Sequence, residues 1–347
     1  MKNVREAGTV NRKNVYSSKK ADAARKPNIG NGNNMESMKT AIEFEQLSIV
    51  ADLTGGKRYI VHDLSFCIHE KERLAIVGES GSGKTMTAMA LFGLLPENCH
   101  AAGKILYQSR NVLTMREREI ERMRGKEFVL MPQSGADFLN PSLKVRYQVY
   151  ETLRKCGIEK RNLAEKASEL LGRVGFSDPA SVLNKYPFQL SGGMAQRVVL
   201  AIGLASDSKV VVCDEPTRGV DDETSILFLD ALYASFSESA ILVITHNIAV
   251  ASRCDYMLVM LGGELMEYGP VPAVLNSPSH PYTKSLIGAL PENHFAINEE
   301  QREYHGAEIA GEECVFAKRC PVAAERCFKE KPALIEHNSV LRRCYQC

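Results

Sequence analysis

The hydrophobic pattern divides the chain into a polar start, a long patterned middle and a broken end. From Ile42 to Leu47, and again from Asp63 to Ile68, apolar and polar residues alternate, which predicts two half-exposed β-strands at a sheet edge. Three short continuous apolar runs occur, at Leu74–Val77, Val210–Cys213 and Ile241–Ile244. Such runs are typical of parallel strands with helices on both faces. Met257–Leu261, followed by two glycines, predicts one more strand and a turn.

Segments of helix length separate these strands. Met86 to Leu95 follows a glycine-rich turn, and a charged stretch from about Val145 to Val174 is helical in character. Strands that alternate with helices indicate an α/β domain. We therefore predict an α/β core over residues 41–275 with an antiparallel edge sheet, and a helical subdomain inserted at about 134–197.

Both ends of the chain differ from this core. Residues 1–40 hold nine Lys or Arg against three acidic residues and almost no apolar periodicity. Such a segment buries too little apolar surface to offset the entropy of ordering. We expect a disordered, solvated tail there, in preference to a tether for a membrane surface or nucleic acid. At the other end, Ser277-Pro-Ser-His-Pro281 breaks the pattern, and a distinct extension over residues 276–347 is expected.

Composition and charge are those of an ordinary globular protein. Hydrophobic residues make up 44% and charged residues 24%, and the formal net charge is +1, so no whole-molecule field points to nucleic acid or acidic lipid. The longest apolar runs, such as Val198 to Ala205, are far shorter than the roughly 18–20 residues of a membrane helix. The polar N-terminus does not resemble a secretory signal. We expect a cytoplasmic protein whose membrane role, if any, requires partners that span the bilayer.

The first chemical motif is a glycine-rich loop. Gly78-Glu-Ser-Gly-Ser-Gly-Lys-Thr85 fits the Walker A pattern in full and has the strand before it and the helix after it that this motif needs. Glycines allow backbone N–H groups to surround a phosphate, and a helix N-terminus adds positive partial charge. A chance glycine-rich turn is the alternative. The motif predicts an ATP site made by Gly78, Ser80, Gly81, Ser82, Gly83, Lys84, Thr85 and Met86.

Two acids complete the predicted site. The apolar run Val210–Cys213 ends in Asp214 and Glu215. Asp214 is placed to hold Mg²⁺ together with Thr85, and Glu215 is placed to orient or deprotonate the attacking water. Such a pair is common at strand ends by itself, but a coincidence is improbable downstream of a Walker A loop. Lys84 is expected to reach the β and γ phosphates.

A third motif makes the resemblance to a family specific. Leu190-Ser-Gly-Gly-Met-Ala-Gln-Arg197 is similar to the signature motif of ABC transporter ATP-binding proteins, which other P-loop classes lack. Ser191, Gly192 and Gly193 open a predicted helix whose exposed N–H groups can meet a phosphate. The resemblance implies a P-loop NTPase (RecA-like) core. It also implies that these residues bind ATP held by an opposite subunit, so that nucleotide joins two ATP-binding domains.

The remaining landmarks of this family follow in order. Gln133 resembles the Q-loop glutamine, which senses magnesium and faces the permease, and His246 resembles the switch histidine that contacts the γ phosphate. Asp221 lies at the D-loop position, although Arg218-Gly-Val-Asp221 departs from the usual Thr-Ala-Leu-Asp. Tyr59 is the nearest candidate for an aromatic residue that stacks on adenine. The resemblance thus implies catalytic roles for Glu215, His246 and Gln133 and a Mg²⁺ site of Thr85, Gln133 and Asp214.

Two further segments favour one branch of the family. Leu139-Asn-Pro141, soon after the Q-loop, and Ser279-His-Pro-Tyr-Thr-Lys-Ser-Leu286 resemble the oligopeptide, dipeptide and nickel importers. The branch implies ATP-driven uptake of peptides, with nickel or a metal chelate as the second choice. It also implies two permease subunits, a second ABC ATPase subunit in a heterodimer, an extracytoplasmic solute-binding protein and a position on the cytoplasmic face of the membrane. Nucleic acid is not expected as a partner.

Cysteines gather near the C-terminus, where five of the ten lie in the last 34 residues. Some members of the branch carry a similar set that binds a four-iron four-sulfur cluster. Four thiolates suit such a cluster or a zinc ion, and gaps longer than those of zinc knuckles favour the cluster. Unliganded thiols are the third alternative. The fifth thiol, Cys347, is read as a spare or substitute ligand, and the expected ligands are Cys314, Cys320, Cys327 and Cys344.

An ABC ATPase that acts on ribosomes or DNA is the main alternative function. Ribosome-acting members usually carry two ABC units in one chain, and this chain has one. DNA-repair members carry a long coiled coil between the motifs, whereas 107 residues separate Lys84 from Ser191 here, without a sustained heptad. A non-hydrolysing ATP switch would be expected to lack Glu215 or His246, and both are present. The sequence therefore favours an ATPase that drives transport.

Overall fold

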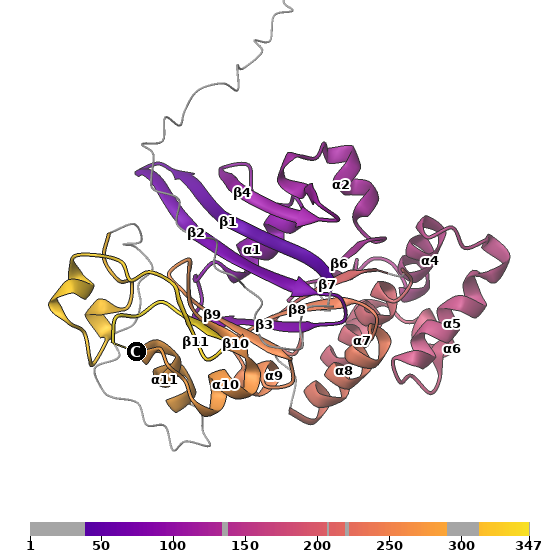
Figure 1. The fold of residues 1–347 in the computed structure, drawn as a ribbon. Coiled ribbons are helices and arrows are strands. Elements are labelled where there is room, and N and C mark those ends of the chain that lie inside the picture. The colour runs from indigo at the N-terminus through magenta and orange to yellow at the C-terminus, as the bar shows by residue number, and fades with distance from the viewer. Residues whose placement is uncertain (1–38, 134–137, 207, 219–221, 290–311, 347) are drawn as a thin grey trace, which may run out of the picture.

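A computed structural model describes residues 39–133, 138–206, 208–218, 222–289 and 312–346. Its strands form two sheets (Figure 1). The smaller, antiparallel sheet has the order β2-β1-β4-β5, with β1 Thr40–Leu53, β2 Gly56–His69, β4 Cys99–Tyr107 and β5 Arg110–Asn111. The larger sheet has the order β11-β12-β10-β9-β3-β8-β7-β6, with β3 Arg73–Gly78, β6 Phe128–Met131, β7 Val210–Asp214, β8 Ala240–Thr245, β9 Tyr256–Leu261, β10 Glu264–Pro270, β11 Ile335–His337 and β12 Val340–Arg342.

The larger sheet is parallel in its centre and antiparallel at one edge. Strands β6, β7, β8, β3 and β9 pair in parallel, while β10, β12 and β11 continue the sheet antiparallel. Parallel strands need helical crossovers, and these cover the sheet. The α-helices are α1 Lys84–Leu91, α2 Glu117–Met123, α4 Val145–Lys155, α5 Leu163–Arg173, α6 Pro179–Asn184, α7 Gly192–Gly203, α8 Asp222–Ser235, α9 Ile248–Ala251, α10 Val271–Asn276 and α11 Pro281–Gly288.

Short 3₁₀ helices occupy several connections. They are η1 Val112–Thr114, η2 Lys160–Asn162, η3 Pro187–Gln189, η5 Ala317–Arg319 and η6 Glu325–Phe328. Among the described residues, no helix is long and apolar enough to cross a bilayer.

The central strands are apolar throughout because each faces two cores. Leu74 and Ile76 of β3 pack into the core shared with α1 and the antiparallel sheet. Ala75 and Val77 of the same strand pack into the core shared with α7, α8 and the remaining helices. Figure 1 shows α1 between the two sheets and α7 and α8 on the opposite face of the larger one. The predicted α/β architecture with an antiparallel edge sheet is confirmed.

The inserted helices pack on one another through apolar faces at helical spacing. Val145, Val149 and Leu153 of α4 are fully buried. They lie on one face of the helix, because residues three or four positions apart are about one turn apart. Helices α4 to α6 project to one side of the molecule (Figure 1). Helix α7 begins among them and runs back to the main sheet, where the space around Gly203 is closed by the Met131 side chain. The predicted subdomain limit at about 197 therefore falls inside a single helix.

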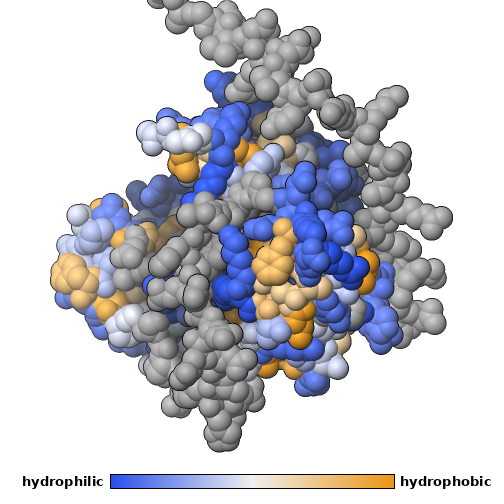
Figure 2. All heavy atoms as spheres, turned by 90° about the vertical axis from the view of Figure 1, so that its left-hand side faces the viewer, coloured by the Kyte–Doolittle hydropathy of each residue, from blue (hydrophilic) through white to orange (hydrophobic). Residues whose placement is uncertain are grey.

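The C-terminal extension is joined to the main sheet. Strand β12 pairs with β10 through Glu267↔Arg342 and Tyr268↔Leu341. The Glu267 carboxylate is fully buried and accepts the backbone N–H groups of Ser279 and His280 at 2.8 and 3.0 Å. On this side of the molecule, apolar residues form small islands among hydrophilic ones (Figure 2). The extension therefore continues the larger sheet of the core at its β10 edge.

Candidate nucleotide site

The glycine-rich loop follows β3 and ends where α1 begins, as its sequence predicts. Gly78 and Gly83 have φ of +153° and +94°, in the region that favours glycine. A Cβ at Gly78 would lie 2.1 Å from the Met260 carbonyl oxygen, and one at Gly83 would lie 2.7 Å from that of Ile60. Glycine at both positions therefore allows the loop to pack directly against neighbouring backbone.

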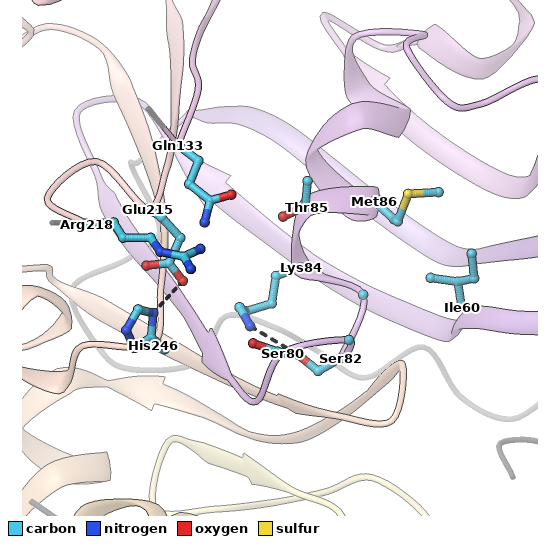
Figure 3. A pocket seen from close by; sticks show the side chains of 12 residues that line it. Ile60, Ser80, Ser82, Lys84, Thr85, Met86, Gln133, Glu215, Arg218 and His246 are labelled. Atoms are coloured by element: carbon cyan, nitrogen blue, oxygen red, sulfur yellow. Dashed lines mark hydrogen bonds and ion pairs between the residues drawn. The ribbon is translucent and has the colours of Figure 1, made fainter. Parts of the chain in front are cut away.

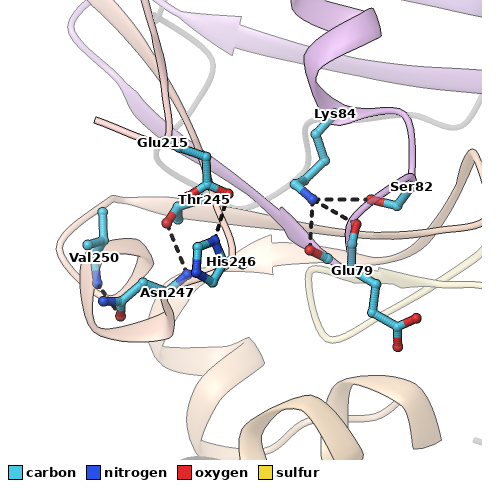
Figure 4. Close-up of polar contacts among 9 residues, drawn as sticks. Glu79, Ser82, Lys84, Glu215, Thr245, His246, Asn247 and Val250 are labelled. Carbon is cyan, nitrogen blue, oxygen red and sulfur yellow. Dashed lines mark hydrogen bonds and ion pairs between the residues drawn. The ribbon is translucent and has the colours of Figure 1, made fainter. Parts of the chain in front are cut away.

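Lys84 lies inside this loop and is buried. Its ammonium donates to the carbonyl oxygens of Gly78 and Glu79 at 2.7 and 2.8 Å and approaches the Ser82 hydroxyl at 3.4 Å (Figure 4). Burial lowers its pKa, although Glu215, Asp214 and Glu79 oppose that effect. A desolvated ammonium gains most from a neighbouring anion. The loop therefore presents a positive charge suited to phosphate.

A cleft of about 450 Å³ opens over the loop. In Figure 3 Glu215 and His246 lie on one side of Lys84, and Ile60 and Met86 lie on the other. Most of the predicted phosphate-site residues line this cleft. The lining consists of Ile60, Ser80, Gly81, Ser82, Gly83, Lys84, Thr85, Met86, Gln133, Glu215, Arg218 and His246.

Asp214 lies at the end of β7 beside Thr85. Burial raises the pKa of Asp214, although the neighbouring Thr85 hydroxyl and Lys84 oppose the rise. Its Oδ1 atom is buried and has no hydrogen-bond partner among the described residues. A buried carboxylate oxygen without a donor fits a hard cation, and Mg²⁺ is bound through carboxylate, hydroxyl and water oxygens. Thr85, Asp214 and the cleft residue Gln133 therefore fit a magnesium site.

Glu215 and His246 form a pair at the edge of the cleft. A Glu215 Oε1 atom lies 2.8 Å from His246 Nδ1. Glu215 has φ of +49°, and its N–H donates to the Ile244 carbonyl at 2.8 Å. The two residues meet because they follow the adjacent parallel strands β7 and β8. A non-glycine residue in this backbone region is uncommon, and the Glu215 carboxylate is aimed at the cleft (Figure 3).

The signature residues do not line this cleft. Ser191 caps α7, its hydroxyl accepting the Met194 N–H at 3.3 Å. Gly192 is exposed and Gly193 is half-buried at the same helix end, so the site that they could serve lies outside their own chain's cleft. The predicted D-loop residue, Asp221, lies outside the described residues.

Tyr59, the predicted aromatic residue beside the adenine, is not among the residues that line the cleft. Tyr59 contacts His62 edge-on, whereas its neighbour Ile60 lines the cleft. Successive side chains of a strand point to opposite faces, so only one of the two can face the loop. Arg218 was placed in the D-loop segment from the sequence, but its position in the lining of the cleft was not predicted. The strand pattern alone does not indicate which neighbour faces a ligand.

The four predicted cysteine ligands lie in one region of the extension. Burial raises the pKa of Cys314 to about 11, and Cys327, Cys344 and Cys320 add to the rise. Within the described part of the chain, however, no three His, Cys, Asp or Glu side chains are grouped so that they could hold a metal ion. The expected iron–sulfur cluster and the alternative zinc site are therefore not supported. Cys347 lies outside the described residues.

Comparison with protein families agrees with this geometry. The model of the ABC transporter family matches residues 61–218, and the model of the oligopeptide/dipeptide transporter C-terminal region matches residues 266–327. The dipeptide transport ATP-binding protein DppD of Caldanaerobacter subterraneus is 36% identical over 313 residues, which cover 86% of this chain and 94% of that protein. DppD of Escherichia coli is 34% identical over 284 residues, covering 79% and 86%.

Solved structures agree on the fold. The dimeric ATP-binding cassette MJ0796, in a post-hydrolysis state bound to ADP and Pi, superposes with a TM-score of 0.60 at 22% identity, covering 66% of this chain and 98% of that one. One family model covers the phosphate-binding loop and the other covers part of the C-terminal extension. The chain belongs to the ABC transporter family as an ATP-hydrolysing subunit, in the branch that carries the oligopeptide/dipeptide C-terminal region.

Proposed function

We propose that this subunit binds and hydrolyses ATP in order to drive the uptake of peptides through partner permease subunits. The observation that carries the proposal is the cleft in which Lys84, Thr85 and the Glu215–His246 pair converge. The C-terminal region and the names of the two relatives support peptide as the cargo. Nickel or a metal chelate is the second candidate, and no relative named above supports it.

The proposed chemistry assigns each group a role. Lys84 and the backbone N–H groups from Gly78 to Met86 bind the phosphates, since they combine a buried ammonium with a helix N-terminus. Thr85, Asp214 and Gln133 would hold Mg²⁺, which would supply neutralising charge for the phosphates. Glu215 accepts the proton of the attacking water. His246 orients that carboxylate at 2.8 Å and contacts the γ phosphate.

The proposed assembly explains the signature residues. Ser191, Gly192 and Gly193 complete the ATP site of a second ABC subunit, since they lie at a helix N-terminus, where Ser191 and Gly192 are exposed, and do not line their own chain's cleft. Asp221 is assigned to the contact between the two subunits. We propose that the second subunit is a different ABC chain. Two permeases would span the bilayer, with a solute-binding protein outside and this subunit at the cytoplasmic face.

A strain that lacks this gene provides the test. Uptake of a labelled dipeptide should be lost, and it should be restored by the wild-type chain but not by Glu215→Gln produced at the same level. Uptake of labelled nickel, measured in the same cells, should not change. Lost nickel uptake with normal dipeptide uptake would replace peptide by nickel as the cargo. Normal uptake of both with a ribosome or DNA-repair defect would overturn the transport proposal.

A further inference from the structure

The second residue of the phosphate-binding loop, Glu79, is held by the C-terminal extension. Its backbone N–H donates to the Tyr282 hydroxyl at 3.1 Å, and its carboxylate accepts two hydrogen bonds from Arg319, at 3.0 and 2.5 Å. Its carbonyl accepts from Lys84. Three polar groups of one loop residue are thus fixed, two of them by residues more than 200 positions away.

The extension supports the Arg319 side chain with aromatic rings. The guanidinium lies 5.4 Å from the centre of the Phe316 ring and 6.0 Å from that of Tyr282. Both rings are almost completely buried, and their centres are 5.5 Å apart. A guanidinium on aromatic faces that also makes a two-bond contact with a carboxylate is restricted in geometry. Arg319 is therefore a fixed charge, in contrast to a mobile surface arginine.

The charge of Glu79 makes this contact relevant to nucleotide. A carboxylate beside a loop that binds a triphosphate repels the ligand unless a cation neutralises it. Figure 4 shows the Glu79 carboxylate pointing away from Lys84, and Arg319 is the cation that meets it there. The Glu79 and Arg319 side chains are only 29% and 15% exposed, so solvent screens this charge less than it screens a surface pair.

We propose that Arg319 is a positioning residue for the nucleotide site, which sets ATP affinity by neutralising Glu79 and turning its carboxylate away from the phosphates. The inference rests on the proposed ATP site. It gives the C-terminal extension a role in this subunit's own ATP binding, separate from any contact with a permease. It also predicts that changes in the segment from Cys314 to Cys320, which carries Arg319, alter nucleotide affinity.

A double-mutant cycle tests the proposal. Removing Arg319 (Arg319→Ala) should weaken binding of a fluorescent ATP analogue roughly ten-fold, and the loss should shrink at high salt. Glu79→Gln removes the charge that Arg319 neutralises. The double variant Arg319→Ala/Glu79→Gln should therefore bind within about two-fold of wild type. Arg319→Lys, which keeps the charge and loses the two-bond geometry, should lie between wild type and Arg319→Ala.

A matched control comes from the same extension. Arg326 also stacks on an aromatic ring, 3.8 Å from the centre of Tyr345, and donates to the Tyr345 carbonyl at 2.9 Å. Arg326→Ala should leave affinity unchanged, and thermal melting should show that all variants fold. Equal weakening in Arg319→Ala and the double variant would overturn the proposal in favour of simple support of the fold. Failure of the wild type to bind ATP would instead overturn the nucleotide site itself.

Discussion

At the scale of single residues, the most informative group is Glu215. Its carboxylate is only 13% exposed, while its partner His246 is 62% exposed. The pair thus combines a shielded carboxylate with an imidazole that is open to a ligand. In the proposed mechanism, Lys84 binds the phosphates and neutralises their charge, and Thr85 and Asp214 bind Mg²⁺. Glu215 alone moves a proton. Substitutions should therefore separate binding from turnover.

Glu215→Gln should abolish turnover and preserve binding. Glutamine has nearly the same shape and can still contact His246, but it cannot accept a proton at neutral pH. We expect the rate of phosphate release to fall at least about 100-fold, with the affinity for ATP within two-fold of wild type. Lys84→Ala is the contrasting variant, since it should lose nucleotide binding. Phosphate release near the wild-type rate in Glu215→Gln would place the base at another residue.

At the scale of elements, the N-terminus of α11 joins the extension to the core. His280 is almost completely buried and caps this helix, its Nδ1 accepting the Tyr282 N–H at 3.0 Å. Burial lowers the pKa of His280 to about 4, aided by Lys284 and opposed by a hydrogen bond with the backbone of Arg343. A protonated Nδ1 could not accept the N–H, and its charge would oppose the helix dipole. Neutral His280 therefore stabilises the region that positions Tyr282.

The extension should lose stability in acid because of His280. The unfolded imidazole has a pKa of 6.5 and the folded one of about 4, so the unfolded chain binds more protons between these values. Its contribution is complete above pH 6.5 and is lost as pH falls towards 4, by about 2 kcal/mol between pH 7 and pH 5. Chemical unfolding at both pH values measures this change.

His280→Asn provides the control, because asparagine also caps helices and does not titrate. The variant should lose less stability than wild type between pH 7 and pH 5, whatever its absolute stability at pH 7. An equal loss in both proteins would assign the acid sensitivity to other groups.

Elements with strong local patterns were predictable, and contacts between distant elements were not. The parallel strands follow from continuous apolar runs, because both faces of each strand are buried. The loop from Gly78 to Thr85 follows from residue types that its chemistry requires. Tyr59 stays a prediction, because its neighbour Ile60 lines the cleft and a shift of one residue reverses the face of a strand. The contact between Glu79 and Arg319 joins residues 240 positions apart, and no local pattern encodes it.

The cysteines illustrate a different limit. Spacing in the sequence indicates which thiols can come near one another, but ligation depends on where their sulfur atoms point. The structure brings Cys314 towards the other three without grouping three metal ligands among the described residues. The iron–sulfur cluster therefore stays a prediction, and no step of the proposed mechanism uses it.

At the scale of the whole molecule, the proposed assembly gives one chain two incomplete half-sites. The cleft holds the phosphate loop, the acids and the histidine, while the start of α7 presents Ser191 and its glycines elsewhere. In the proposed assembly, another ABC subunit completes each half. The proposed heterodimer therefore predicts that nucleotide joins this chain to a different ABC chain, and that hydrolysis separates them.

Glu215→Gln should capture that complex, because ATP stays intact in its cleft. With ATP and Mg²⁺, size-exclusion chromatography with light scattering should give a monomer for this variant alone and a dimer when the companion ABC subunit is added. Adding Ser191→Arg to the same chain should prevent the dimer, since a bulky cation would block the end of α7 while leaving the chain's own cleft intact. A dimer of Glu215→Gln without any companion would show that two copies of this chain complete each other's sites, and the heterodimer would then be unnecessary.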